Sequence, residues 1–143
     1  MTRINLVRPD QLSDQHLLAE YRELPRIVND WSHRSTDKSF YKGIPPKYVL
    51  GTGHVKFFRN KIKFLVKRHK DIVKECLKRN FKIAKTNELT SISLIDLDTR
   101  QIEYAPSKEE IEISKERINL KIQQKPKWYK YYGKTNFKTE TTN

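Results

Sequence analysis

The stretch SDQHLLAEYRELPRIVNDW, residues 13–31, decides the fold class because its apolar residues recur with the period of an α-helix. One apolar stripe, with steps of four, three, four and three, consists of Leu17, Tyr21, Leu24, Val28 and Trp31. Ser13 and Asp14 are good N-caps, so we expect the helix to begin there. Because proline removes a backbone donor, a kink or local break is expected at Pro25.

Two further segments repeat this periodicity and extend the prediction to an all-α fold. The first follows the motif GTGH and ends at Asn80, a residue that tolerates the left-handed backbone of a helix stop. We expect a bend near Asn60 to divide it into two helices. The second begins with a capping box formed by Ser107 and Glu110 and ends before Pro126.

The rest of the chain has little regular pattern. Residues 33–53 and 82–105 are predicted connectors, with one short run of alternation at 91–96, and residues 135–143 are predicted to form a flexible tail. A chain of 143 residues supplies one modest core. We therefore expect a single compact domain, 1–143, of about three main helices with long connectors and an aromatic C-terminal segment.

The composition is strongly basic: 30 Lys and Arg residues against 17 Asp and Glu give a formal net charge of +13. A positive field over so small a protein favours polyanionic partners. No apolar run is long enough to span a membrane, and no secretory signal is present, so no membrane partner is expected.

Cysteine and histidine usage indicates neither disulfides nor a metal site. A lone cysteine, Cys76, forms no internal disulfide, which favours an intracellular location. The four histidines are His16, His33, His54 and His69. Their spacing relative to Cys76 matches no zinc motif, so we predict no metal and no cofactor.

The first predicted helix carries a polar face opposite its apolar stripe. At about 100° per residue, an arc of about 120° contains Gln15, His16, Ala19, Arg22, Glu23 and Arg26. Arg22 and Arg26 are like charges at i and i+4, which destabilise an isolated helix by a few tenths of a kcal/mol. A phosphodiester backbone lying over both would remove this repulsion, whereas the alternative interpretation is an ordinary solvated face.

Five motifs in order along the chain, TRINL, DQHLLAEYRELPR, GTGHVKFF, ECLKRNF and KPKWYKYYGK, together resemble the pyrimidine-dimer DNA glycosylases of the phage endonuclease V type. The resemblance runs from Thr2 to about Lys134 and is weakest at 27–47 and 82–105. It implies a small all-α DNA repair enzyme that cleaves the glycosidic bond of the 5′ base of an ultraviolet-induced dimer. It also implies strand cleavage by β-elimination. The implied partner is double-stranded DNA containing pyrimidine dimers or abasic sites, bound by a monomer.

In this family the nucleophile is the α-amine of a threonine exposed by loss of the initiator methionine, and a glutamate on the first helix is the second catalytic group. Thr2 and Glu23 stand at those positions. An α-amine has a pKa of about 7.7–8.0, against about 10.4 for lysine, so a useful fraction is unprotonated near neutral pH. A carboxylate beside the sugar stabilises its developing positive charge and afterwards accepts the acidified sugar proton.

Basic and aromatic residues form the predicted DNA-binding set: Arg3, Gln15, His16, Arg22, Arg26, Arg117, Lys121, Trp128, Tyr129, Lys130, Tyr131 and Tyr132. Aromatic rings interleaved with lysines favour base stacking and phosphate contact, although Trp128 and Tyr132 could instead pack on the core as a strap. The alternative function is a non-catalytic basic nucleic-acid-binding protein. That alternative explains the charge but gives no role to Thr2 and Glu23.

Overall fold

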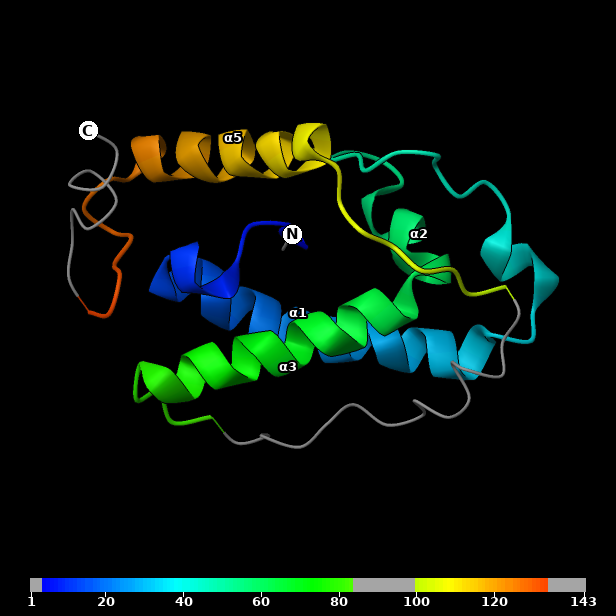
Figure 1. Cartoon of the computed structure of the whole chain (residues 1–143), viewed down its shortest axis with the longest axis horizontal. Coiled ribbons are helices and arrows are strands. Elements are labelled where there is room, and N and C mark those ends of the chain that lie inside the picture. Colours follow the sequence, from blue (N-terminus) through cyan, green and yellow to red (C-terminus); the bar gives the residue numbers. More distant parts are fainter. Residues whose placement is uncertain (1–3, 84–99, 134–143) are drawn as a thin grey trace.

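The structure, a computed structural model, describes residues 4–83 and 100–133, and in these ranges the protein is all-α with no strand (Figure 1). The α-helices are α1 (Asp14–Arg34), α2 (His54–Phe57), α3 (Ile62–Lys78) and α5 (Lys108–Gln124). Three 3₁₀ helices are η1 (Pro9–Gln11), η2 (Lys38–Tyr41) and η3 (Phe58–Asn60). The predicted fold class is confirmed. Thr2, Arg3, the alternation at 91–96 and the tail at 135–143 lie outside the described residues.

Helix α1 begins where its cap predicts. The Ser13 hydroxyl accepts a hydrogen bond from the His16 backbone nitrogen at 3.1 Å. Of the kink or local break expected at Pro25, a break does not occur, because α1 continues through Pro25 to Arg34. Leu24 and Val28 are both buried, so core packing on either side of the proline outweighs the single backbone hydrogen bond that it removes.

The other predicted helix ends are also confirmed. The bend near Asn60 is η3, which separates α2 from α3. Asn80 follows the end of α3 with a φ of 63° and so adopts the left-handed conformation that the sequence predicts. Ser107 and Glu110 form a complete capping box at the start of α5, which ends at Gln124, two residues before Pro126.

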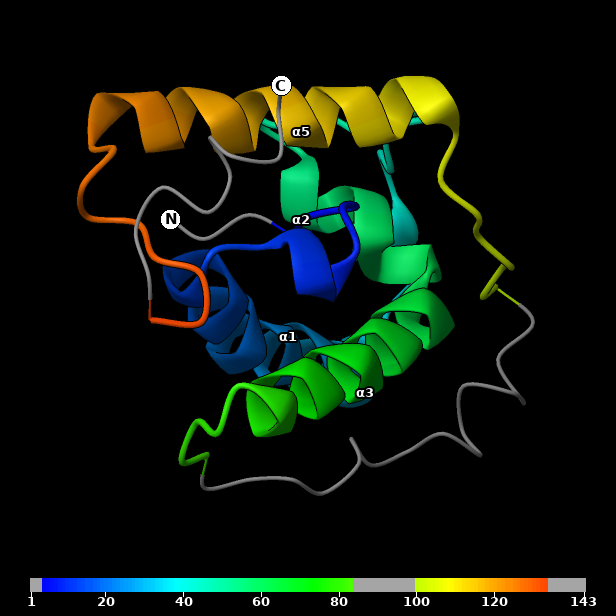
Figure 2. The same ribbon diagram turned by 60° about the vertical axis from the view of Figure 1, so that its left-hand side comes forward.

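The fold has three layers. Helices α1 and α3 pack side by side, α5 lies across the opposite side of the molecule, and the N-terminal segment, residues 4–12, runs between them (Figures 1 and 2). Fully buried side chains come from four parts of the chain: Ile4 and Leu12 from the N-terminal segment, Leu17, Leu24 and Trp31 from α1, Phe57 and Phe58 from the α2–η3 bend, and Leu65 and Ile72 from α3. Burying the N-terminal segment fixes the start of the described chain within the core.

The predicted connector 33–53 contains the end of α1 and η2, and it contributes the buried rings of Phe40 and Tyr48 to the core. In the predicted connector 82–105, residues 84–99 lie outside the described residues. Among the helices that the structure describes, none has the length and apolar character needed to cross a membrane.

Candidate active site and nucleic-acid interface

The backbone of the N-terminal segment is held by side chains from three parts of the fold. The Ile4 nitrogen donates a hydrogen bond to Nε2 of His54 at 2.8 Å, and the Tyr48 hydroxyl donates to the Ile4 carbonyl at 2.7 Å. The Leu6 nitrogen donates to the Ser114 hydroxyl of α5 at 3.0 Å. Buried backbone groups require such partners, so this segment has a fixed position and direction.

Between these anchors, the chain crosses α1 at a buried carboxylate. Oε1 of Glu20 accepts hydrogen bonds from the Asn5 backbone nitrogen at 3.2 Å and from the Asn5 side-chain amide at 2.9 Å. Arg68 of α3 donates to both Glu20 oxygens, and the side chains of Glu20 and Arg68 are 0% and 7% exposed. Both charges are therefore paired and hydrogen-bonded within the core.

Sequence reasoning did not single out Asn5, Glu20 and Arg68. The available signal was the position of Glu20 on the helical wheel, because it falls in the same sector as Leu17 and Leu24. A carboxylate in an apolar sector indicates a buried partner, although the pattern of α1 alone does not identify which cation it is.

Glu23 lies one turn of α1 after Glu20, so it borders the line where the N-terminal segment crosses the helix. Its side chain is 28% exposed, and its Oε2 lies 4.0 Å from Nη1 of Arg26. Arg22 and Arg26 are both exposed on the surface of the helix. This arrangement places a solvent-accessible carboxylate among cations, close to the first described residues of the chain.

Two cations of α5 face the same region. Nη1 of Arg117 donates to the side-chain oxygen of Asn5 at 3.5 Å. The pKa of His16 is lowered to about 4, mainly by burial and in addition by the positive charges of Arg117 and Lys121. These cations therefore lie within electrostatic reach of the first turn of α1.

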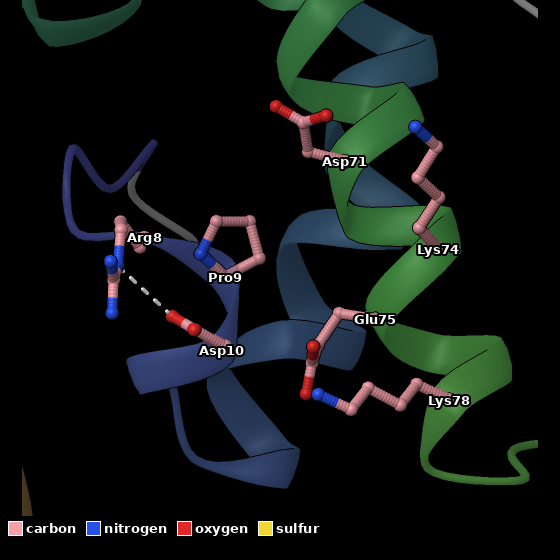
Figure 3. Close-up of a pocket in the computed structure, with 7 residues that line it drawn as sticks. All are labelled: Arg8, Pro9, Asp10, Asp71, Lys74, Glu75 and Lys78. Carbon is pink, nitrogen blue, oxygen red and sulfur yellow. Dashed lines mark ion pairs between the residues drawn. The ribbon is translucent and has the colours of Figure 1, made fainter.

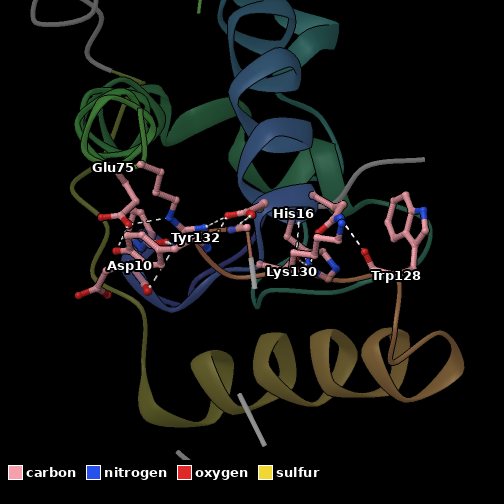
Figure 4. Close-up of polar contacts among 12 residues, drawn as sticks. Asp10, His16, Glu75, Trp128, Lys130 and Tyr132 are labelled. Atoms are coloured by element: carbon pink, nitrogen blue, oxygen red, sulfur yellow. Dashed lines mark hydrogen bonds and ion pairs between the residues drawn. The ribbon is translucent and has the colours of Figure 1, made fainter. Parts of the chain in front are cut away.

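The aromatic segment, residues 128–132, is attached to that first turn (Figure 4). The Gln15 amide donates to the Trp128 carbonyl at 2.7 Å and accepts from the Lys130 nitrogen at 3.0 Å. The His16 ring stacks on Tyr129, with 4.8 Å between ring centroids and 4° between planes. The Trp128 side chain stays largely outside the core, since the residue is 55% exposed.

A second set of contacts, the Asp14 network, fixes the end of the segment and comprises Asp14, Glu75, Arg79 and Tyr132 (Figure 4). The Asp14 carboxylate accepts hydrogen bonds from the Tyr132 nitrogen at 3.0 Å, the Gly133 nitrogen at 2.9 Å and Arg79 at 2.9 Å. Glu75 accepts from Arg79 at 2.8 Å and from the Tyr132 hydroxyl. The Arg79 guanidinium lies 4.4 Å from the Tyr132 ring centroid.

The structure thus gathers most of the predicted site residues around the first half of α1. Gln15, His16 and Tyr132 make internal contacts that position the aromatic segment, and Tyr131 is buried beside them. Arg22, Arg26, Lys121, Trp128 and Lys130 are exposed, and Glu23, Arg117 and Tyr129 are partly exposed. Within residues 4–83 and 100–133, no three His, Cys, Asp or Glu side chains are grouped to hold a metal ion.

An all-α fold that exposes arginines, lysines and aromatic rings on neighbouring elements favours a protein that binds nucleic acid. A family model described as pyrimidine dimer DNA glycosylase matches residues 1–89. Because the match spans more than half of the 143 residues, the chain belongs to the pyrimidine dimer DNA glycosylase family. Its substrate is therefore DNA, and its role is DNA repair. The match includes Thr2 and Glu23, whereas α5 and the aromatic segment lie beyond it.

Proposed function

We propose that this protein cleaves the glycosidic bond of the 5′ base of cyclobutane pyrimidine dimers with the α-amine of Thr2, after removal of the initiator methionine, and then cleaves the strand by β-elimination with the assistance of Glu23. The observation that carries this proposal is the fixed path of Ile4 to Leu6, which crosses α1 one turn from Glu23. An amine two residues before a fixed position is tethered near that carboxylate.

The length of the tether supports the assignment. An extended chain spans at most about 3.6 Å per residue, so an amine on Thr2 would stand within about 7 Å of the Ile4 nitrogen. A nucleophile restricted in this way loses little further translational freedom when it attacks a bound sugar. Arg3, Arg22 and Arg26 would also lower the pKa of a nearby ammonium group, because they disfavour its positive charge.

The chemistry proceeds in two stages. The unprotonated amine bonds to C1′ of the sugar while the glycosidic bond breaks, and the base keeps the bonding electron pair and is protonated by water. The cyclobutane ring still joins that base to the 3′ pyrimidine. Loss of a proton from the attached nitrogen and opening of the sugar ring give an imine. Glu23 stabilises the positive charge that develops on the sugar, then accepts a C2′ proton, and the electrons of that bond expel the 3′ phosphate.

The surrounding cations and rings supply DNA binding in this proposal. Exposed Arg22 and Arg26, with Arg117 and Lys121 across from them on α5, would contact phosphates on either side of the lesion. Trp128 is exposed on a segment held at both ends, so it would stack on a base without first having to be ordered. The proposed enzyme acts as a monomer on double-stranded DNA and requires no cofactor.

Borohydride reduction in the presence of abasic-site DNA tests the proposed nucleophile. The reagent converts an imine into a stable amine, so we expect a covalent protein–DNA adduct in which mass spectrometry finds the sugar on the N-terminal peptide. Protein that retains Met1 should form less than about a hundredth of this adduct, because its α-amine is displaced by one residue.

Lys61 provides the control, because it is the described lysine whose pKa burial lowers. A Lys61→Gln variant that folds should form the adduct as readily as the wild type. Undiminished trapping with Met1 retained would assign the chemistry to a lysine. Absence of any adduct under conditions of tight binding would instead favour a non-catalytic nucleic-acid-binding protein.

A further inference from the structure

Helix α3 carries a second basic surface, which we call the lysine stripe. Its members follow one another at steps of four, three, four and four residues: Lys63, Lys67, Lys70, Lys74 and Lys78. At about 100° per residue, this spacing places all of them within an arc of about 80° on one face of the helix. None of them belongs to the candidate active site.

The lysine stripe faces away from the core. Leu65, Ile72 and Cys76 of α3 are fully buried on the opposite face, while Lys67, Lys74 and Lys78 are exposed. In Figures 1 and 2, α3 lies on the side of the molecule away from α5, which carries Arg117 and Lys121. The protein therefore presents positive charge on two separate sides.

Among the described residues, few acidic side chains lie along the lysine stripe. Lys63 pairs with the exposed Glu103 at 3.4 Å, and Asp71 lies at the edge of the arc. A hollow of about 340 Å³ between η1 and α3 is lined by three cations and three anions, Arg8, Lys74, Lys78, Asp10, Asp71 and Glu75 (Figure 3). Arg8 pairs with Asp10 at 3.2 Å, and Glu75 is committed to Arg79. Two of the three anions of the hollow are thus paired with arginines, so within its lining Asp71 is the remaining anion beside Lys74 and Lys78.

The dimensions of the lysine stripe match a nucleic-acid backbone. The 15-residue separation of Lys63 and Lys78 corresponds to about 22 Å along an α-helix. Duplex DNA carries one negative charge per about 1.7 Å, so several phosphates lie within this length. Like charges at i, i+3 and i, i+4 repel one another in an isolated helix, and a polyanion along the stripe removes that repulsion. Lysines contact phosphates as point charges without reading sequence.

We propose that the lysine stripe binds the backbone of a second DNA duplex while Arg22 and Arg26 of α1, with Arg117 and Lys121 of α5, hold the first. One protein molecule would then bridge two duplex segments. Duplex DNA is favoured as the occupant because DNA is the substrate of this family and is therefore the polyanion that the protein meets. The bridging activity does not depend on the chemistry proposed for Thr2.

The test compares two variants of equal charge. The stripe variant is Lys67→Gln, Lys74→Gln and Lys78→Gln together, and the control variant is Lys42→Gln, Lys47→Gln and Lys108→Gln, which are exposed lysines outside both surfaces. An undamaged duplex is fixed to beads, loaded with one protein molecule per duplex, and offered a fluorescent second duplex. The wild type and the control variant should capture the second duplex, whereas the stripe variant should capture at least fivefold less.

Two further measurements separate the proposal from a loss of structure or a change of net charge. Glutamine has nearly the helix propensity of lysine, so both variants should keep the wild-type melting temperature. The charge-preserving change of the same three stripe residues to Arg should restore capture. Equal capture by the stripe and control variants, or no capture by the wild type, would overturn the proposal. If the stripe variant loses binding to phosphatidylserine vesicles but captures the second duplex as well as the wild type does, the proposal is also overturned. The stripe would then be assigned to a membrane surface.

Discussion

Two glutamates three residues apart on α1 have opposite environments. The Glu20 side chain is fully buried and accepts hydrogen bonds from Asn5 and Arg68, whereas Glu23 is partly exposed with Arg26 at 4.0 Å. A carboxylate whose oxygens are already bonded within the core stabilises the fold. A carboxylate at the surface among cations is accessible to a substrate.

Changing Glu23→Gln should separate binding from catalysis. We expect affinity for dimer-containing DNA to stay within about tenfold of the wild type, while the incision rate falls by about 100-fold or more, because the lost charge acts mainly in the transition state. Gel-shift titration and single-turnover incision measure the two quantities. Equal losses of affinity and rate would make Glu23 a binding or structural residue.

Glu20→Gln is the matched control for this prediction. It leaves the buried Arg68 without its ionic partner, so the free energy of unfolding should fall by about 3–5 kcal/mol. Urea unfolding measures this loss, which Glu23→Gln should not show.

At the scale of elements, the first turn of α1 holds the aromatic segment through three consecutive side chains. Asp14 binds the end of the segment, Gln15 binds its backbone on both sides of Tyr129, and His16 stacks on the Tyr129 ring. The aromatic segment is therefore ordered by contacts with α1 and α3 rather than by secondary structure of its own.

Asp14→Asn should release this segment, because an amide cannot accept all the hydrogen bonds that the carboxylate accepts from Arg79, Tyr132 and Gly133. We expect trypsin to cleave after Lys130 several-fold faster than in the wild type, as measured by mass spectrometry. Asp10→Asn is the control, since Asp10 forms an exposed ion pair with Arg8 that contributes little to stability. Unchanged cleavage in Asp14→Asn would show that other contacts hold the segment.

Across the whole molecule, His16 of α1 stacks on Tyr129 of the aromatic segment and lies within electrostatic reach of Arg117 and Lys121 of α5. Its pKa in the folded protein is about 4, mainly because of burial, against an ordinary value of 6.5. Between these two values the unfolded chain binds a proton that the folded protein does not. Stability therefore decreases as the pH is lowered from about 6.5 to about 4.

His16→Gln should remove this component of the acid sensitivity. The wild type should lose up to about 3 kcal/mol of unfolding free energy across that window through His16 alone, so the difference between the two proteins should narrow as the pH falls. Urea unfolding at pH 7, 5.5 and 4.5 measures the difference. A constant difference at all three values would show that the pKa of His16 is the same in the folded and the unfolded protein.

The sequence by itself determined the all-α class, most of the helix ends and the family. Ser13, Asn80 and the Ser107–Glu110 box act within one or two turns of backbone, so local hydrogen bonding makes them readable from the chain. The exposed face with Glu23 and Arg26 also follows from helical period alone. The five motifs indicated the family that the residue 1–89 match then confirmed.

Only the tertiary structure decided the continuity of α1 at Pro25, the pairing of Glu20 with Arg68 and the attachment of the aromatic segment. The carboxylate of Glu20 is paired with a residue 48 positions away, and that of Asp14 with the backbone of a residue 119 positions away. Such pairs form because α1 and α3 pack against each other and against the aromatic segment, and buried charges must find partners there. Local periodicity shows that a charge is buried but does not identify its distant partner.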